Sequence, residues 1–306
     1  MTDDTGLLIS IGELARSTGF PVRTIRFYCD EGILEARRSP GGHRLFEADG
    51  ATERLLLIRR LRAFGLGLES ITGVLRGERS IDEAVAAESA RVEREFRSVA
   101  WRRASLRAVG SADPAQRADR LALLAAAQDG GALHDDLVRF WRRILAPIDR
   151  HEVDRYVGWN VPEPPADPTV DEVVAYAELA ALVADRTMTG AVRQYLWWHQ
   201  PDLIRDPQGL YADVADALTD VVARVANNVR PRRGSELDRF VEAHADARGL
   251  RDSPAFREHL LADTPDHRID RYWTLTAQLV GDRVTVGRAI DWVRGALVDS
   301  TGAAAC

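Results

Sequence analysis

The chain has 306 residues, 45% of them hydrophobic, and a formal net charge of −6 at pH 7. That length has room for two domains, and that hydrophobic content is ample for packed cores. No apolar run reaches membrane-spanning length, and the N-terminus lacks the basic-then-apolar layout of a signal peptide. Two cysteines, Cys29 and Cys306, fit a reducing compartment and provide no disulfide framework. We therefore expect a soluble cytoplasmic protein with no membrane partner.

Charge is divided unevenly along the chain. Residues 1–110 contain 18 Arg against 16 Asp and Glu, for a net charge of +2, whereas residues 111–306 contain 23 Arg against 31, for a net charge of −8. DNA binding by the first part would therefore depend on placed contacts more than on a diffuse positive field. The acidic remainder would be repelled by DNA, and we expect it to have another task.

A short helix is predicted near the N-terminus. Ser10 and Glu13 have the spacing of a capping box, which starts a helix, and Thr18-Gly19 ends it after about two turns. Pro21 suits the first turn of a helix, so a second helix is expected to open at once. Two helices joined by so tight a turn indicate a helix-turn-helix.

The second helix carries the polar side chains that such a unit presents to DNA. Val22 and Ile25 lie three residues apart on the side predicted to be buried. The side chains predicted to project elsewhere are Arg23, Thr24, Arg26 and Tyr28. An arginine-bearing second helix is the element that enters a major groove, where arginine can read guanine edges or hold phosphates.

A β-hairpin is predicted directly after this helix. Two short extended arms flank Pro40-Gly41-Gly42, which is a turn signal. The basic side chains near the turn are Arg37, Arg38, His43 and Arg44. We expect this hairpin to act as a wing that grips the phosphate backbone.

These motifs resemble those of the MerR family of transcription regulators. The matching segments are IGELA, VRTIRFYCDEGIL, GGHRLF and LLLIRRLRAFGLGLESI, in the family's order and spacing. Phe27 and His43 stand where the family commonly has tyrosine, and Gly67 replaces the usual Ser or Thr cap before the fourth helix. The residues expected to contact DNA are Arg16, Arg23, Thr24, Arg26, Phe27, Tyr28, Arg37, Arg38, Gly42, His43 and Arg44.

The resemblance also implies a mechanism. A family member binds a pseudo-palindromic operator in an over-long promoter spacer as a dimer. When liganded, it untwists and bends the double-stranded DNA so that RNA polymerase can use both promoter elements, which is control through deformation energy. RNA polymerase at the promoter is therefore an expected partner.

Residues 78–110 are expected to form the dimerisation helix, capped by Ser80 and running to about Arg107. Its apolar positions recur at the spacing of a coiled-coil seam, although Glu88, Glu95 and Arg103 interrupt the second row. The predicted contact residues are Val85, Val92, Phe96, Val99 and Leu106. An amphipathic helix packed on its own domain is the alternative. The family resemblance favours an antiparallel coiled coil between two protomers.

Beyond residue 110 the sequence predicts helices only, with an internal repeat. The segment FWRRILAPIDRHEVDRY (140–156) aligns without gaps to FREHLLADTPDHRIDRY (256–272), an offset of 116 residues. The duplicated units are expected at about 118–185 and 234–300, separated by a segment at 188–229. The resulting domain is similar in architecture, though in no motif, to the helical antibiotic-recognition domains of the TipA type that end some MerR relatives.

No constellation of catalytic residues is convincing. His151 and Asp154, repeated as His267 and Asp270, could form a proton-transfer pair or half of a metal site, but such a set more often caps a helix. No cysteine lies between Cys29 and Cys306, which argues against sensing of metals or redox state through clustered thiols. We therefore expect no enzyme, no metal site and no cofactor.

Aromatic residues suggest an effector site. Six of the seven Trp follow residue 140, and an all-helical domain rich in Trp and Tyr suits an apolar or aromatic small molecule. Trp197-Trp198 is the leading candidate because adjacent residues on a helix cannot both face one core. The other candidates are Tyr195, Trp141, Trp159 and Trp273. The alternative is that these aromatics are simply core residues.

The sequence thus predicts an all-α protein with a small β-hairpin wing. Its parts are a winged helix-turn-helix at 1–77, a dimerisation helix at 78–110 and a duplicated helical effector domain at 111–306. The expected function is that of a ligand-responsive, homodimeric DNA-binding regulator of transcription. The alternatives are a DNA-tethered helical enzyme, an antibiotic-sequestering protein and a ligand-free architectural DNA binder.

Overall fold

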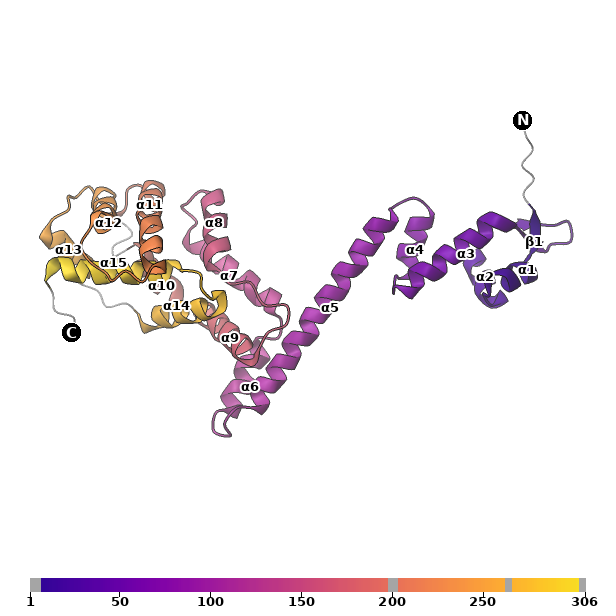
Figure 1. The fold of residues 1–306 in the computed structure, drawn as a ribbon, viewed down its shortest axis with the longest axis horizontal. Helices are drawn as coiled ribbons and strands as arrows, with labels where there is room; N and C mark the ends of the chain where they lie inside the picture. The colour runs from indigo at the N-terminus through magenta and orange to yellow at the C-terminus, as the bar shows by residue number, and fades with distance from the viewer. Residues whose placement is uncertain (1–6, 198–202, 262–265, 303–306) are drawn as a thin grey trace, which may run out of the picture. The chain divides into compact units, whose positions relative to one another are not determined.

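The computed structural model describes residues 7–197, 203–261 and 266–302. It divides into two compact units, Met1–Glu95 (unit 1) and Phe96–Cys306 (unit 2), which are described separately. Within the described ranges, nearly every element is a helix and the strands form one three-stranded sheet (Figure 1). The predicted all-α fold with a small wing is confirmed.

Unit 1 contains the predicted helix, turn, helix, hairpin, helix and helix. The elements are α1 (Ile11–Thr18), α2 (Val22–Asp30), β2 (Arg37–Arg38), β3 (Arg44–Glu47), α3 (Ala48–Ala63) and α4 (Leu68–Leu75). A further strand, β1 (Leu8–Ser10), was not predicted. It pairs antiparallel with β3, so the sheet order is β1-β3-β2.

Local capping explains where α1 begins and ends. The hydroxyl of Ser10 accepts a hydrogen bond from the backbone of Glu13, whose carboxylate accepts one from the backbone of Ser10. Gly19 ends the helix in the left-handed conformation (φ 71°), and its N–H donates to the carbonyl of Ala15 at 2.8 Å. The turn leads directly to Pro21 and α2, as predicted.

The core of unit 1 joins the helix-turn-helix to the sheet and to α3. Its fully buried apolar side chains include Leu14, Ile25, Phe46, Leu55, Ile58 and Ile71. They come from α1, α2, β3, α3 and α4, so one cluster fixes the mutual position of α2 and the wing. A rigid scaffold of this kind holds surface arginines in fixed places.

A long helix, α5 (Ile81–Gly110), crosses the boundary between the units. Ser80 and Glu83 form a second capping box, in which each accepts a hydrogen bond from the other's backbone N–H. The helix thus begins at the predicted cap and runs three residues beyond the predicted end at Arg107.

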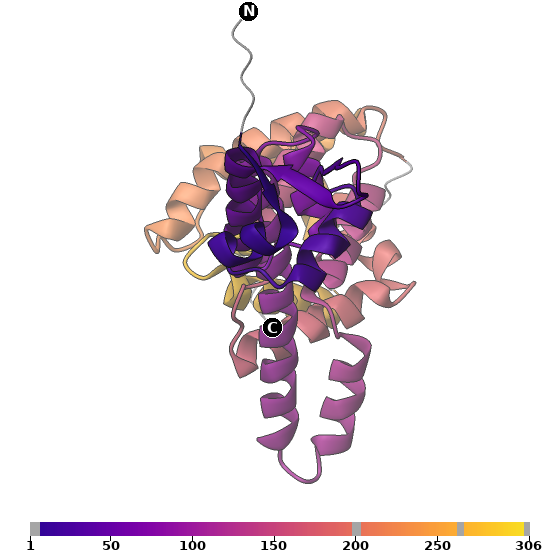
Figure 2. The same cartoon turned by 90° about the vertical axis from the view of Figure 1, so that its right-hand side faces the viewer.

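Unit 2 consists of helices in its described residues. They are α6 (Arg117–Ala126), α7 (Gly130–Ile144), α8 (Arg150–Asn160), α9 (Val170–Ala184), α10 (Met188–Trp197), α11 (Pro207–Ala226), α12 (Ser235–Asp246), α13 (Pro254–Leu261), α14 (His267–Val280) and α15 (Val286–Thr301). Helix α9 packs against α6, α7, α10 and α14, whereas α11 packs against α12 and α15. Helix α6 returns beside the last turns of α5 (Figure 2), where the indole of Trp101 donates to the carbonyl of Ala127 at 2.8 Å.

Two helices of unit 2 begin 116 residues apart with the same cap. The hydroxyl of Thr169 caps α9 and that of Thr285 caps α15. Asp149 and Asp266, which lie 117 residues apart, cap α8 and α14 by accepting from the backbone N–H of His151 and Arg268. None of the described helices is long and apolar enough to cross a membrane.

Candidate DNA interface and effector cavity

Helix α2 presents arginines on its exposed side. The side chains of Arg23 and Arg26 are exposed, Thr24 is half-buried and Ile25 is fully buried. Arg16, in the last turn of α1, is also exposed. Within the described ranges, none of these three arginines makes an ion pair. Their guanidinium groups therefore remain available to phosphates and base edges.

Tyr28 was predicted to project with these arginines, and that prediction is wrong. Its side chain is only 7% exposed and belongs to the core of unit 1. The ring meets that of Phe20 edge-on, with 6.1 Å between ring centroids, whereas Phe27 beside it stays 45% exposed. The reason is helical periodicity, because a residue three positions after Ile25 lies on the same side of the helix.

The wing has the predicted turn. The N–H of Gly42 donates to the carbonyl of Ser39 at 2.9 Å, and the N–H of His43 donates to the Ser39 hydroxyl at 3.1 Å. Gly42 has φ 78°, a conformation that L side chains rarely adopt. The side chains of Arg37, Arg38 and His43 are exposed around this turn. Neither arginine makes an ion pair with another described residue.

Arg44 differs from the other wing arginines. Its guanidinium lies 2.5 Å from the carboxylate of Asp30, at the end of α2, and its side chain is 26% exposed. This ion pair joins the wing strand β3 to the last residue of α2. A phosphate contact from Arg44 therefore stays a prediction, in competition with Asp30.

Three arginines of α3 donate hydrogen bonds to backbone carbonyls of unit 1. Arg54 donates to the carbonyls of Ile33 at 2.7 Å and Leu75 at 3.2 Å, which ties the segment after α2 to the end of α4. Arg59 donates to the carbonyl of Thr18 and lies over the ring of Phe20 at 4.6 Å. Arg62 donates to the carbonyl of Leu66 at 3.0 Å. The roles of Arg54 and Arg59 were not predicted because their acceptors lie 21 and 41 residues away in sequence.

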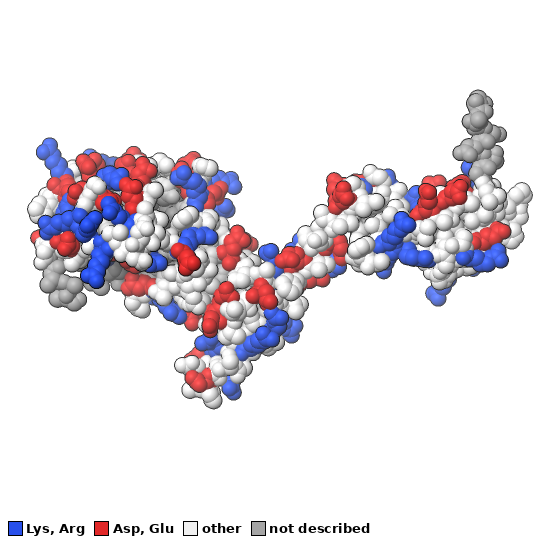
Figure 3. All heavy atoms as spheres, viewed as in Figure 1, with Lys and Arg blue, Asp and Glu red and all other residues white. Residues whose placement is uncertain are grey.

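A group of acidic side chains lies at one edge of unit 1. On the face drawn in Figure 3, Arg side chains follow the lower edge of unit 1 and a cluster of acidic side chains lies on its upper edge. A shallow hollow beside α1 and α3 is lined by Glu13, Asp49 and Glu53. The acidic edge would repel DNA, whereas the exposed arginines of α2 and the wing would attract it.

The arginine-bearing α2, the wing and their shared core define a winged helix-turn-helix domain. Residues 9–78 match the model of the MerR HTH family of regulatory proteins. HTH-type transcriptional regulator MerD of Shigella flexneri is 31% identical over 118 residues, which are 37% of this chain and 96% of MerD. The chain belongs to the MerR family of regulatory proteins, as its motifs predicted.

Other relatives match over the same part of the chain. Nodulation protein NolA of Bradyrhizobium elkanii is 37% identical over 84 residues, which are 27% of this chain. A second NolA, from Bradyrhizobium sp. (strain NC92), has the same identity over the same length. The matched segments are 38% and 35% of the two NolA chains, so this chain spans little more than a third of these relatives. No solved structure matches it.

The predicted dimer residues of α5 are exposed in the single chain. The exposed fractions of Val85, Val92, Phe96, Val99 and Leu106 range from 45% to 68%. Residues seven apart on a helix lie nearly above one another, so Val85, Val92, Val99 and Leu106 form one apolar stripe.

The aromatic residues predicted to line an effector pocket separate into two groups. Trp141 and Trp273 are buried in the core with 5.8 Å between their ring centroids, and the indole of Trp141 donates to the Tyr272 hydroxyl at 2.6 Å. Tyr195 is also buried. These three side chains complete the core of unit 2, which is the alternative that the sequence left open. Trp198 and the side chain of Trp197, the leading candidates, lie outside the described residues.

Trp159 lines a cavity. Its side chain is 47% exposed, and it contributes to a space of about 570 Å³ bounded by α8, α10, α11, α12 and α15. That volume lies in the range of small-molecule sites. The indole of Trp159 donates to the carbonyl of Val284 at 3.0 Å, and the guanidinium of Arg283 donates to the carbonyl of Trp159 at 3.0 Å. The cavity wall is therefore anchored to the segment before α15.

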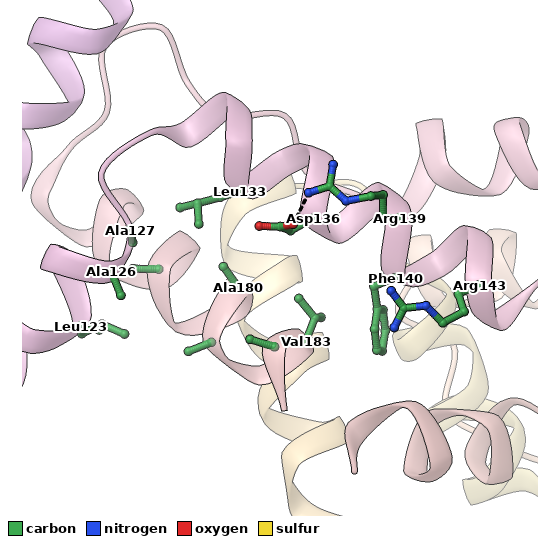
Figure 4. Close-up of a pocket in the computed structure, with 13 residues that line it drawn as sticks. Leu123, Ala126, Ala127, Leu133, Asp136, Arg139, Phe140, Arg143, Ala180 and Val183 are labelled. Carbon is green, nitrogen blue, oxygen red and sulfur yellow. Dashed lines mark hydrogen bonds and ion pairs between the residues drawn. The ribbon is translucent and has the colours of Figure 1, made fainter. Parts of the chain in front are cut away.

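A second, smaller hollow of about 360 Å³ lies between α6, α7 and α9. Figure 4 shows Leu123, Leu133 and Phe140 at its wall together with the ion pair of Asp136 with Arg139. Three charged side chains, Asp136, Arg139 and Arg143, line it, and many of its apolar groups are single alanine methyls, so it offers a ligand fewer large apolar side chains than the first cavity does.

The histidines and aspartates that recur in the two repeats interact with neighbouring residues or helix caps. Asp154 pairs with Arg142 at 2.9 Å, and the backbone of exposed His151 donates to the cap Asp149 at 2.8 Å. His267 lies 3.7 Å from Asp266, which caps α14. Within the part of the chain that the structure describes, no three His, Cys, Asp or Glu side chains gather as metal ligands would.

Proposed function

We propose that this regulator binds a pseudo-palindromic promoter operator as a homodimer and distorts it under the control of a small apolar effector. The observation that carries the proposal is that the same chain holds two sites. Exposed, unpaired arginines lie on α2 and the wing of unit 1, and a ligand-sized apolar cavity lies in unit 2. DNA recognition and ligand recognition thus belong to one polypeptide.

The dimer part of the proposal is supported by α5. A row of apolar side chains on one face of a 30-residue helix is costly to leave in water. A second copy of the same helix covers it with matching side chains, since the heptad spacing repeats along the row. Two protomers would then present two copies of α2 to successive turns of DNA.

The internal repeat remains a proposal about how the effector region arose. The equal offset of the Thr169 and Thr285 caps is consistent with duplicated units at about 118–185 and 234–300.

Helix α11, which lies between these units in sequence, contributes Leu210, Val214 and Leu218 to the cavity. We propose that the effector occupies this cavity, with Trp159 at its wall.

RNA polymerase is the proposed second partner, by membership of the family. The liganded dimer untwists and bends the promoter so that polymerase can use both of its elements. An antibiotic-sequestering protein is the second candidate function, because the same cavity would serve it. In that case ligand would bind without any effect on transcription.

The test uses the full chain. A thermal-shift screen of uncharged hydrophobic antibiotics and metabolites identifies ligands, and each ligand is then added to transcription in vitro from a promoter that carries an enriched binding site. We expect a stabilising ligand to change transcription, and Ala215→Trp, which fills the cavity from α11, to abolish both effects. Binding without a change in transcription would favour sequestration, and consumption of the ligand would favour an enzyme.

A further inference from the structure

We propose that the cavity beside Trp159 accepts an uncharged, mainly apolar molecule that carries an acceptor oxygen, such as a ketone or amide carbonyl, and that the Tyr156 hydroxyl donates to that oxygen. This inference rests on the proposed effector role of the cavity and specifies the chemistry of its ligand.

The wall of the cavity is made mostly of aliphatic side chains. Leu196, Leu210, Val214, Leu218, Val222 and Val286 line it, together with the ring of Trp159. Such a surface gains free energy from contact with apolar groups and offers nothing to replace the hydration shell of an ion. A ligand that fills this space must therefore be largely apolar.

Most polar groups at the wall are already engaged within the protein. The side chain of Asn160 donates to the carbonyl of Tyr156 at 3.1 Å and accepts from the N–H of Val286 at 2.9 Å. The hydroxyl of Thr219 donates to Ala215 at 2.9 Å, and that of Tyr211 reaches the carbonyl of Glu152 at 3.4 Å. These groups hold the wall in place and are not positioned for a ligand.

The hydroxyl of Tyr156 is not engaged in this way. Its side chain is 6% exposed, and its ring packs against that of Trp141 with 4.9 Å between centroids. Among the described residues, none provides a hydrogen-bond partner for its buried hydroxyl. A buried hydroxyl without a partner costs free energy, which a ligand can recover by accepting a hydrogen bond from it. Burial also raises the pKa of Tyr156 well above its usual value, so the hydroxyl remains a donor.

The ionisable side chains of the cavity wall, Arg155 and His244, do not favour a charged ligand. Arg155, at the rim, is paired with Glu152. Burial, followed by the effect of Arg248, lowers the pKa of His244 well below its usual value, so this wall residue stays neutral. An anion or a cation would lose its hydration without gaining a partner of opposite charge in the wall.

Three naphthalene probes that differ at one ring position test this inference on the full chain. Acetylnaphthalene carries a carbonyl, isopropenylnaphthalene replaces its oxygen with a methylene group, and naphthoate carries a charge. Quenching of Trp fluorescence reports binding. We expect the ketone to bind about two- to tenfold more tightly than the hydrocarbon, which corresponds to one hydrogen bond. Naphthoate should bind more weakly than both.

One variant and one control variant assign the selectivity to Tyr156. Tyr156→Phe, which removes only the hydroxyl, should bind the two uncharged probes equally. Tyr176→Phe is the control, because Tyr176 is buried in the same unit but lies outside this cavity. Its hydroxyl donates to the carbonyl of Pro162 at 2.7 Å, and the ketone preference should survive its loss.

The possible failures are distinguishable. If no probe binds, or if Ala215→Trp leaves binding unchanged, the cavity is not the ligand site and the proposed effector function is wrong. If the probes bind in the cavity but ketone and hydrocarbon bind equally, or naphthoate binds best, only the inference about ligand chemistry is overturned. Equal ketone preference in Tyr156→Phe and the parent would also overturn it.

Discussion

The guanidinium of Arg44 on β3 forms an ion pair with the carboxylate of Asp30, the last residue of α2, with 2.5 Å between nitrogen and oxygen. The pair joins the wing to α2, and it places a negative charge beside an arginine expected to face phosphate. The carboxylate of Asp30 is 62% exposed, so we expect the pair to matter more for DNA binding than for folding.

Asp30→Asn should strengthen non-specific DNA binding. The substitution releases Arg44 for one more phosphate contact, and each such contact makes the slope of log K against log salt steeper by about one. Titrating the duplex at several salt concentrations measures this slope. Asp49→Asn, which removes the same charge on the acidic side of unit 1, is the control. An unchanged slope in Asp30→Asn would show that Arg44 does not reach DNA.

Arginines of α2 and of the wing should differ in what they contribute. Arg26→Ala should cost about 1–3 kcal/mol in operator binding and relax sequence preference, since a base contact is lost. Arg37→Ala should weaken binding to all sequences alike. Arg139→Ala removes the same charge from unit 2 and should bind as the parent does. Competition titrations with operator and random duplex separate these effects, and full affinity of both test variants would refute the interface.

The apolar stripe of α5 should hold the dimer together. Replacing Val92 and Val99 with Asp buries two carboxylates in the proposed seam, so the full chain should become monomeric and lose operator binding. Ala90→Asp is the control, because Ala90 is exposed and lies about 160° around the helix from Val92. Sedimentation gives the oligomeric state. A dimeric double variant would exclude this stripe as the interface.

The stability of unit 2 should fall in mild acid because of His244. Burial lowers the folded-state pKa of this group well below its usual 6.5, so below about pH 6.5 the unfolded chain binds a proton that the folded chain does not. The free energy of unfolding then decreases by up to about 1.4 kcal/mol per pH unit, until the folded-state pKa is reached.

Urea unfolding at pH 7.5 and pH 5.5 measures this effect, and Trp fluorescence reports on unit 2 because all seven Trp lie in it. His244→Gln should lose less stability between the two pH values than the parent does. His151→Gln, a change at an exposed histidine, should behave as the parent. Equal acid sensitivity of the parent and His244→Gln would rule out His244 as the cause.

Features set by neighbouring residues were predictable from the sequence. The capping boxes at Ser10 and Ser80, the left-handed Gly19 and the wing turn depend on contacts within about four residues. Their order and spacing also led to the family. Strand β1 was missed because its partner, β3, lies more than thirty residues away in sequence.

Features that depend on tertiary contacts were not predictable. The partner of Arg44 and the carbonyls bound by Arg54 become neighbours only in the folded unit. Trp141 and Trp159 look alike in sequence, yet packing buries one and leaves the other at a cavity. Tyr28 is different, because its spacing from Ile25 already placed it on the buried side of α2.

The most direct test of the account is selection of binding sites from random DNA with the full chain, followed by measurement of the mass of the complex. Two copies of α2 in a symmetric dimer predict enrichment of a pseudo-palindrome whose half-sites bind two chains per duplex. Enrichment of a single half-site bound by one chain, or no enrichment over random sequence, would contradict the proposed dimeric regulator.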